Sequence, residues 1–204
     1  GSTSGTNAIL ERTGARTALL VTKGFKDLLL IGNQQRPDLF TLNVVKPQPL
    51  YDVVIEIDER VESNGDVLTG LHQKTIDSTI KWLKKNKAES VAIALVNSFR
   101  NPVHEVMLSR ALETAGFRYR SVSSLLSSQI KILQRAETSV ANAYLDPIIR
   151  NYISGIEGKL SGAVLHVMTS AGSLVKSNSF FPKDSLLSGP AGGVVGAAEQ
   201  GLKS

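Results

Sequence analysis

Residues 6–40, TNAILERTGARTALLVTKGFKDLLLIGNQQRPDLF, hold the densest succession of apolar runs and structure-breaking residues in the chain. Residues 17–22, TALLVT, are a short apolar run with β-branched ends, which predicts a buried strand. Gly24 interrupts that run, and apolar residues then recur at helical spacing, so a helix is predicted over residues 25–31. Pro37 ends the pattern, because the residue before a proline is disfavoured in the helical conformation.

A short helix is predicted before this strand. Asn7 is expected to cap it, because its side-chain oxygen can accept an N–H group of the first turn. The helix is expected to run through Leu10 and Glu11. Gly14 is expected to supply the left-handed conformation that often ends a helix.

Strands and helices alternate along the following hundred residues. An Asn-Gly turn at residues 63–66 predicts a tight return between two short strands. Alternation of this kind is typical of an α/β domain with a mainly parallel or mixed sheet flanked by helices, assigned here to residues 1–136. The predicted strands cover residues 51–60, 67–68, 90–96 and 117–122, and the predicted helices cover residues 75–86 and 101–115.

A second segment is predicted over residues 137–204. It opens with a long helix over residues 138–160, whose wide apolar stripe indicates packing on two sides. Pro147 lies inside this helix and is expected to kink it or to mark a join between two helices. A strand over residues 163–168 and a glycine-rich helix from Gly189 onward complete the segment.

The composition excludes several classes of protein. The chain of 204 residues has no cysteine, so disulfides and thiolate chemistry are absent, and a cytoplasmic location is expected. No apolar run reaches the ~18–20 residues of a membrane span. The net charge of +5 comes from scattered basic residues, and only 5% of residues are aromatic, so no nucleic-acid partner is expected.

Three runs carry a resemblance to a known family. Residues 6–12 read TNAILER, residues 17–32 read TALLVTKGFKDLLLIG, and residues 36–40 read RPDLF. Together they resemble the N-terminal signature of the hydantoinase/5-oxoprolinase family. The AYLDP run at residues 143–147 is similar to the opening of the central domain in that family.

The resemblance implies a fold like that of the actin, Hsp70 and sugar-kinase ATPases. It also implies that the intact protein uses ATP and Mg²⁺ to open a five-membered cyclic amide, such as a hydantoin or 5-oxoproline. The amide carbonyl oxygen would be phosphorylated, and water would then displace the phosphate. A second subunit or domain of the hydantoinase B type is the implied partner.

The resemblance further implies that the two phosphate motifs of the family lie outside residues 1–204. The chain is therefore expected to be an excised piece that is inactive by itself and holds no cofactor. Its catalytic residues remain unknown at this stage.

The best candidate for holding phosphate is SGPAGG, at residues 188–193. Glycines let a backbone approach a ligand closely, and a helix N-terminus presents free N–H groups to an anion. Ser188, Gly189, Gly192 and Gly193 are the predicted cofactor-binding residues, and the resemblance supports them because SGPAGG is a family run. Close packing of a neighbouring element against the small residues is the alternative.

Five further residues are candidates for binding substrate. Thr169 and Ser170 follow a predicted strand in MTSAG, which is similar to a family turn in which a second glycine occupies the place of the serine after Gly172. Ligands of open α/β sheets lie outside the carboxyl ends of strands. Thr6 and Asn7 offer polar side chains, and Arg36 could clamp a carboxylate. The alternatives are an ordinary turn, a helix cap and a surface ion pair.

No metal site is predicted. His72, His104 and His166 lie far apart in the sequence without the spacing of metal ligands, and His166 is expected in the core or on an edge strand. Asp58 and Glu59 are adjacent on a predicted strand, so they are expected on opposite faces rather than as a catalytic pair.

Two other functions stay open. The intact protein could be a carboxylase-type subunit that uses ATP to activate a ketone, because the resemblance covers both kinds of enzyme. The chain could instead be a non-catalytic binding or assembly domain. A large exposed apolar patch on the helix at residues 138–160 would favour the second alternative, and a buried helix would count against it.

Overall fold

The computed structural model describes residues 3–33, 40, 46–160 and 163–201. The chain divides into two compact units. Unit 1 combines Gly1–Ala15 with Tyr144–Ser204, and unit 2 consists of Arg16–Ala143. The division falls inside helix α6, Ile132–Glu157, so this helix contributes residues to both units.

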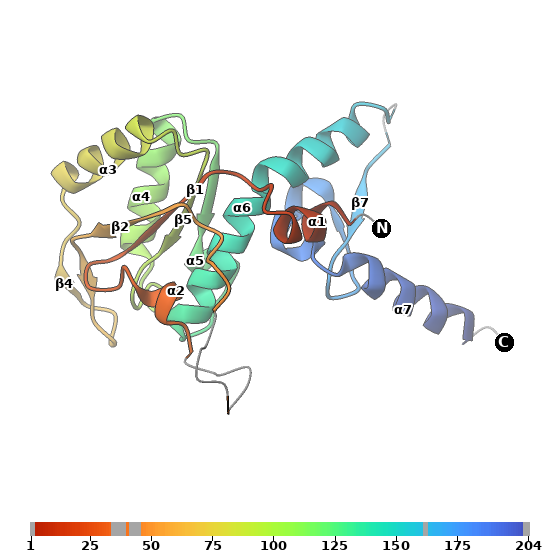
Figure 1. The fold of residues 1–204 in the computed structure, drawn as a ribbon, viewed down its shortest axis with the longest axis horizontal. Helices are drawn as coiled ribbons and strands as arrows, with labels where there is room; N and C mark the ends of the chain where they lie inside the picture. The colour runs from red at the N-terminus through yellow and green to blue at the C-terminus, as the bar shows by residue number, and fades with distance from the viewer. Residues whose placement is uncertain (1–2, 34–39, 41–45, 161–162, 202–204) are drawn as a thin grey trace. The chain divides into compact units, whose positions relative to one another are not determined.

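Unit 2 is built on a parallel sheet with the strand order β2-β1-β5-β6 (Figure 1). Every residue of β1 and β5 is buried, as expected for central strands covered on both faces. The α/β class with a mainly parallel sheet flanked by helices is therefore confirmed. The strands are β1 (Thr17–Thr22), β2 (Val53–Ile57), β5 (Ser90–Ala94) and β6 (Tyr119–Val122).

The remaining elements of unit 2 connect these strands. The predicted Asn-Gly turn is present, with Gly65 at a φ of 100° between two antiparallel strands. The short strands are β3 (Arg60–Val61) and β4 (Val67–Thr69), and the helices are α2 (Leu28–Ile31), α3 (Gln73–Lys85), α4 (Val103–Thr114) and α5 (Ser123–Leu126).

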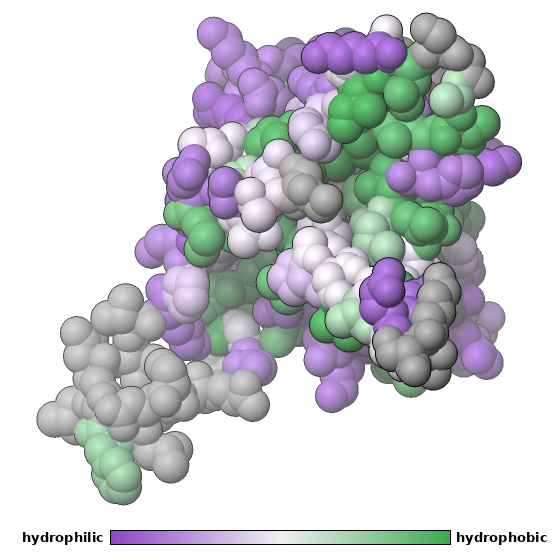
Figure 2. Space-filling view, turned by 90° about the vertical axis from the view of Figure 1, so that its right-hand side faces the viewer, coloured by the Kyte–Doolittle hydropathy of each residue, from purple (hydrophilic) through white to green (hydrophobic). Residues whose placement is uncertain are grey.

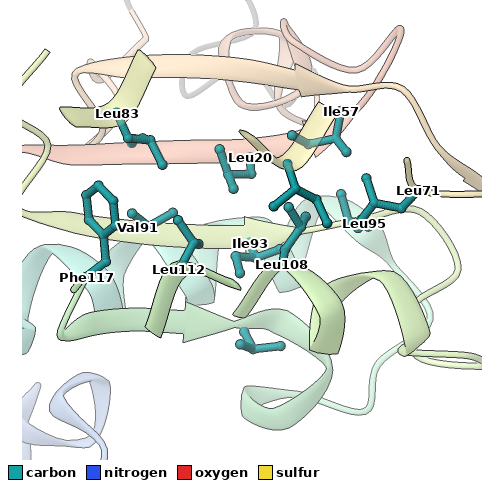
Figure 3. Packing of buried hydrophobic residues seen from close by; sticks show 13 residues of the cluster. Leu20, Ile57, Leu71, Leu83, Val91, Ile93, Leu95, Leu108, Leu112 and Phe117 are labelled. Carbon is teal, nitrogen blue, oxygen red and sulfur yellow. The ribbon is translucent and has the colours of Figure 1, made fainter. Parts of the chain in front are cut away.

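Alternate residues of the central strands feed two separate apolar clusters. Leu20 and Ile93 point to the side where α3 and α4 supply Leu83, Leu108 and Leu112 (Figure 3). On the other side, Leu19, Val21, Ala92 and Ala94 pack with Val140 of α6 and with partly buried residues of α2. Burying one such leucine or isoleucine stabilises the fold by ~1.5–3 kcal/mol, so both faces of the sheet contribute to the stability of unit 2.

Unit 1 contains the two ends of the chain. Its strands form an antiparallel pair, β7 (His166–Met168) with β8 (Leu174–Lys176). Besides its part of α6, its helical elements are α1 (Ser4–Leu10), the short 3₁₀ helices η1 (Ser177–Ser179) and η2 (Pro182–Ser185), and α7 (Ser188–Gly201).

Two predictions about the first helix are wrong. Helix α1 begins at Ser4, so Asn7 lies inside it and does not cap it. The left-handed residue after the helix is Arg12, with a φ of 56°, and Gly14 does not have a positive φ. Gly14 is required for another reason: a Cβ atom there would lie 2.0 Å from the ring of Tyr144.

The predicted strand over residues 51–60 is divided, because β2 ends at Ile57 and Arg60 begins β3 of another sheet. The bounds of other elements differ as well. Helix α2 has only four residues, because Gly24 and the turn after it occupy the predicted first turn. Strand β7 is shorter than predicted and is exposed at His166, which confirms an edge position. Helix α6 begins at Ile132, before the predicted start, and continues through Pro147 to Glu157 as one helix.

Candidate functional site

The predicted phosphate-binding run forms the start of α7. Ser188 is buried, and its hydroxyl donates a hydrogen bond to the carbonyl oxygen of Ser185 at 2.9 Å. Leu187, just before the helix, adopts a left-handed φ of 58°. The chain therefore turns sharply out of η2 into α7, and the Ser188 hydroxyl is used to hold that turn.

Few N–H groups of this helix start are open to an anion. Pro190 has no N–H group, and the N–H of Ala191 already bonds the carbonyl oxygen of Leu187 at 3.1 Å. Of the first turn, the N–H groups of Leu187, Ser188 and Gly189 remain for a ligand. This is fewer than the several donors that usually surround a bound phosphate at a glycine-rich helix start.

The glycines of α7 have open surroundings. A Cβ atom added at Gly189 or Gly193 would meet no atom of the described chain within 4 Å. At Gly192 it would meet the Met168 side chain at 3.5 Å, an ordinary contact. Within the part of the chain that the structure describes, close packing therefore does not explain Gly189 and Gly193, and another backbone or a ligand can approach them.

Thr169 and Ser170 lie in the turn between β7 and β8. Thr169 is buried, and its hydroxyl lies 2.9 Å from the hydroxyl of Ser173, the residue that replaces the second glycine of the family turn. The exposed Ser170 donates its N–H to the carbonyl oxygen of Asp184 at 2.8 Å. Strand β7 belongs to an antiparallel pair, so the rule for carboxyl ends of parallel sheets does not apply, and binding by these two residues stays a prediction.

The other predicted substrate residues are Thr6, Asn7 and Arg36. Thr6 and Asn7 lie in α1, where Thr6 is half-buried and Asn7 is exposed. Arg36 lies outside the described residues. A substrate contact by any of the three stays a prediction.

Helix η2 joins the predicted segments of unit 1, and sequence reasoning missed it. Its carbonyl oxygens accept hydrogen bonds from the N–H of Ser170 and from the hydroxyl of Ser188. Helix α1 packs on the same element, because a Cβ atom at Gly5 would lie 2.3 Å from Oγ of Ser185. The fold therefore gathers α1, the β7–β8 turn and the start of α7 around four residues that carry no recognisable motif.

An apolar cavity of about 300 Å³ lies beside η2 within unit 1. Side chains of α6, β7 and β8 line it together with Phe180, Ser185 and Ser188. Figure 2 shows hydrophobic side chains gathered on this face of the molecule, and unit 1 exposes Val164, Leu174, Leu187 and Val194. The cavity suits an apolar group, since the hydroxyls of Ser185 and Ser188 donate to backbone carbonyls.

Unit 2 contains a buried polar cluster that the sequence did not indicate. One carboxylate oxygen of Glu59 accepts the hydroxyl of Thr22, and the other lies 2.6 Å from Nδ1 of His104. The N–H of Leu71 donates to Nε2 of His104 at 3.3 Å, so this nitrogen is an acceptor and Nδ1 carries the proton. The exposed Asp58 pairs instead with Lys23 at 3.3 Å. The two acids lie between β2 and β3 and not on one strand as predicted, and they have separate partners.

A second buried cluster surrounds Arg135, which is fully buried. Its guanidinium donates to the hydroxyls of Ser98 and Ser123 and to the carbonyl oxygen of Leu95, and lies 4.0 Å from Glu105. Burial lowers the pKa of Arg135, and the nearby Glu105 carboxylate opposes that shift. Both clusters are enclosed, so they hold the ends of strands rather than a substrate.

The described residues do not by themselves form a complete nucleotide site. Among residues 3–33, 40, 46–160 and 163–201, no three His, Asp or Glu side chains gather closely enough to hold a metal ion. The few open N–H groups at the start of α7 cannot surround a triphosphate. These residues therefore do not fit Mg-ATP unaided.

Comparison with known proteins identifies the family. A model of the hydantoinase/oxoprolinase N-terminal region matches residues 1–116, and a model of the hydantoinase/oxoprolinase domain matches residues 135–204. The chain belongs to the hydantoinase/oxoprolinase family, as its three motifs predicted. The predicted boundary between residues 136 and 137 stays a prediction.

Individual relatives agree with this assignment. The chain is 41% identical to the 5-oxoprolinase of Saccharomyces cerevisiae over 96% of its length, and spans 18% of the length of that relative. The structure of the ATP-dependent caprolactamase from Pseudomonas jessenii is similar with a TM-score of 0.80 and 27% identity, covering 94% of this chain and 29% of the caprolactamase chain.

An acetone carboxylase structure has the same fold. Its TM-score is 0.82 at 20% identity, with 97% of this chain and 31% of that chain covered.

No helix in the described part of the chain combines the length and the apolar character needed to cross a membrane.

Proposed function

We propose that this chain is part of an ATP-dependent hydrolase that opens a five-membered cyclic amide of the hydantoin or 5-oxoproline class. The observation that carries the proposal is the 41% identity to a 5-oxoprolinase along almost the whole chain. The likeness to an ATP-dependent caprolactamase supports it, because caprolactam is also a cyclic amide. In the proposed reaction the terminal phosphoryl group of ATP would pass to the amide carbonyl oxygen and release ADP. Water would then add to that carbon, and the ring C–N bond would break as the nitrogen takes up a proton. A second water would release phosphate from the resulting acyl phosphate.

Within this proposal, unit 1 contributes to the nucleotide and substrate sites without completing them. The N–H groups of Ser188 and Gly189 and the open surfaces of Gly189 and Gly193 are available to a phosphate or to a backbone that carries one. Gly192 lies beside Met168 of β7 and is proposed to belong to the same phosphate-binding run. Thr6 and Asn7 of α1 and Thr169 and Ser170 of the β7–β8 turn are proposed on the substrate side.

The remaining proposals concern the setting of the protein. Mg²⁺ is proposed to accompany ATP, held by residues other than those described here. A hydantoinase B type subunit or domain is proposed as the partner. The absence of cysteine is compatible with the proposed cytoplasmic location.

A chimera tests the proposed function. The matching region of the yeast 5-oxoprolinase is replaced by residues 1–204, and ATP hydrolysis that depends on 5-oxoproline is measured. The expected result is an active chimera, since the chain covers the region at 41% identity. A chimera that folds and retains no hydrolysis dependent on 5-oxoproline would contradict the proposal. The parent enzyme with the same region deleted is the inactive control.

The ketone carboxylase alternative has less support. The acetone carboxylase structure is only 20% identical, so its likeness supports a common fold and not a common substrate. Measuring acetone-dependent ATP hydrolysis with the same chimera separates the two, because a cyclic amide hydrolase should give none.

The non-catalytic assembly alternative is not favoured by α6. The apolar residues of that helix, including Val140, Tyr144, Ile149 and Ile153, are mostly buried, and Tyr152 is the large exposed exception among them. A buried helix is what the enzyme reading expects, because the helix then serves as part of a core and not as a docking surface.

A further inference from the structure

Three side chains converge at one edge of the parallel sheet in unit 2. Phe25 comes three residues after the end of β1, Arg60 three residues after the end of β2, and Asn97 three residues after the end of β5. These strands are neighbours in the sheet, so the three residues meet at its carboxyl edge.

This position is the switch point of the sheet. From β1 the chain passes to β2 on one side, and then returns to place β5 on the other side of β1. Ligands of open α/β sheets lie in the crevice outside the carboxyl ends of strands at such a point. A shallow pocket of about 360 Å³ opens here, lined by residues that include Arg60, Glu62, Asn64 and Asn97.

Arg60 is held in place without a charged partner. Its guanidinium lies 5.5 Å from the centre of the Phe25 ring, and the pairing register of β3 with β4 shifts between Arg60 and Val61. Among the described residues the guanidinium has neither an ion pair nor a hydrogen bond. Half-buried and stacked, it has lost much of its freedom before any ligand arrives.

The acidic residues near Arg60 are already engaged. Glu59 bonds Thr22 and His104, as described above, and Asp58 pairs with Lys23. Glu56 accepts the N–H of Gly24 at 2.7 Å. These three carboxylates therefore have partners other than Arg60. Among the described residues, Glu62 is the one acid that lines the same pocket as Arg60.

We propose that Arg60, beside Phe25 and Asn97, binds a small monocarboxylate that also carries an N–H donor. The planar guanidinium can hold a carboxylate through two parallel hydrogen bonds. The Glu62 carboxylate and the amide oxygen of Asn97 offer acceptors to the N–H of the ligand, and Glu62 disfavours a second negative charge. This class includes 5-oxoproline, but the argument rests on the charges of the pocket and not on the proposed hydrolysis.

The test is a titration of the whole chain with N-acetylglycine, monitored by ¹H–¹⁵N NMR spectra. Saturable shifts are expected for the amides of residues 60–64 and of Asn97. N-methylacetamide, which lacks the carboxylate, should produce no such shifts. Inorganic phosphate should bind more weakly than N-acetylglycine because of Glu62. Tighter binding of phosphate, or equal shifts with N-methylacetamide, would overturn the assignment of the ligand.

Variants test the role of the guanidinium. Arg60→Gln should weaken N-acetylglycine binding at least about tenfold, and Arg60→Lys should weaken it less because the charge remains. Arg118→Gln is the matched control. Arg118 lies 5.6 Å from the Tyr119 ring and lines a pocket at the amino end of β6. Unchanged binding in both folded Arg60 variants, or an equal loss in Arg118→Gln, would refute the site.

Titration with 5-oxoproline separates this site from the proposed hydrolysis. 5-Oxoproline is expected to shift the same amides even if the chimera is inactive, because the site binds a carboxylate and an N–H group. Loss of activity in the chimera combined with binding at Arg60 would leave the site standing. An active chimera without these shifts would remove the site and leave the proposed function.

Discussion

Substituting Glu105→Gln tests the buried cluster at the ends of β5 and β6. In the folded protein one oxygen of Glu105 accepts the N–H of Leu95 at 2.9 Å and the hydroxyl of Ser123 at 2.6 Å. The other oxygen accepts the N–H of Ser124 at 2.9 Å. Arg135 lies 4.0 Å away, and both ionic side chains are fully buried. Glutamine keeps the size and one acceptor, but it removes the charge.

The cost follows from two losses. An amide NH₂ group in place of the second oxygen faces the N–H of Ser124, which leaves a buried donor unsatisfied at a cost of ~1–3 kcal/mol. The charge of Arg135 also loses its counter-ion, and a separation of 4.0 Å corresponds to about 4 kcal/mol at an effective dielectric constant of about 20. Relaxation makes these terms less than additive, so we expect unfolding to become easier by about 3–5 kcal/mol.

Urea unfolding followed by the fluorescence of Trp82 measures this loss. Trp82 is the single tryptophan and packs against the core cluster of unit 2, so its signal reports that unit. The control is Glu113→Gln on the same helix α4, where the exposed carboxylate pairs with Arg120 at 2.8 Å. It should cost less than ~1 kcal/mol. Equal small losses in the two variants would refute the view that Glu105 balances a buried charge.

Three other predictions concern packing, protonation and ligand binding. Gly14→Ala should destabilise unit 1 by ~1–3 kcal/mol, because the new Cβ meets the Tyr144 ring. Faster hydrogen exchange at Ala15 measures this loss. Gly189→Ala, where the Cβ meets no atom within 4 Å, should leave the exchange rate unchanged. Burial and the charge of Asp27 raise the pKa of Tyr51. The free energy of unfolding should therefore hold below about pH 10 and fall above it. Tyr51→Phe should abolish that fall in urea titrations at alkaline pH. Millimolar Mg-ATP should not raise the Tm of this chain, although a ligand at 100 times its Kd would add ~2.7 kcal/mol.

Local patterns predicted the sheet of unit 2 well. Strands β1 and β5 are continuous apolar runs, and burial on both faces is the physical condition that such runs satisfy. Continuous apolar runs that alternate with helical patterns indicate strands covered by helices on both faces, so the parallel sheet was predictable from local patterns. The Asn-Gly turn was equally predictable, because Gly65 adopts the positive φ that the residue type favours.

Other features depend on interactions between residues far apart in the chain, and local patterns did not predict them. Helix α6 begins before the start that its apolar stripe predicts, and Arg135 lies in the additional part. Its partners Ser98 and Ser123 lie 37 and 12 residues away, and no local pattern indicates that they would bury a charge. Asn7 and Gly14 were assigned to capping by residue type, whereas the contact of Gly14 with Tyr144 depends on residues far apart in the chain.

The candidate site depended even more on such contacts. Family motifs indicated the start of α7 and the β7–β8 turn. Helix η2, whose carbonyl oxygens accept hydrogen bonds from both, carries no motif. The carboxyl edge of the sheet was also hidden, because the residues there become neighbours only when β1, β2 and β5 pair in register.

The two buried clusters explain why Arg60 stands out at that edge. Glu59 and Glu105 accept hydrogen bonds from side chains and N–H groups at the ends of β1, β5 and β6, so most of the polar groups along the carboxyl edge are satisfied internally. An edge closed in this way has few places where a ligand gains by displacing water. Arg60 differs because its donors are oriented by Phe25 and meet no acceptor among the described residues. Among the described residues of this edge, Arg60 therefore keeps donors that a ligand can use.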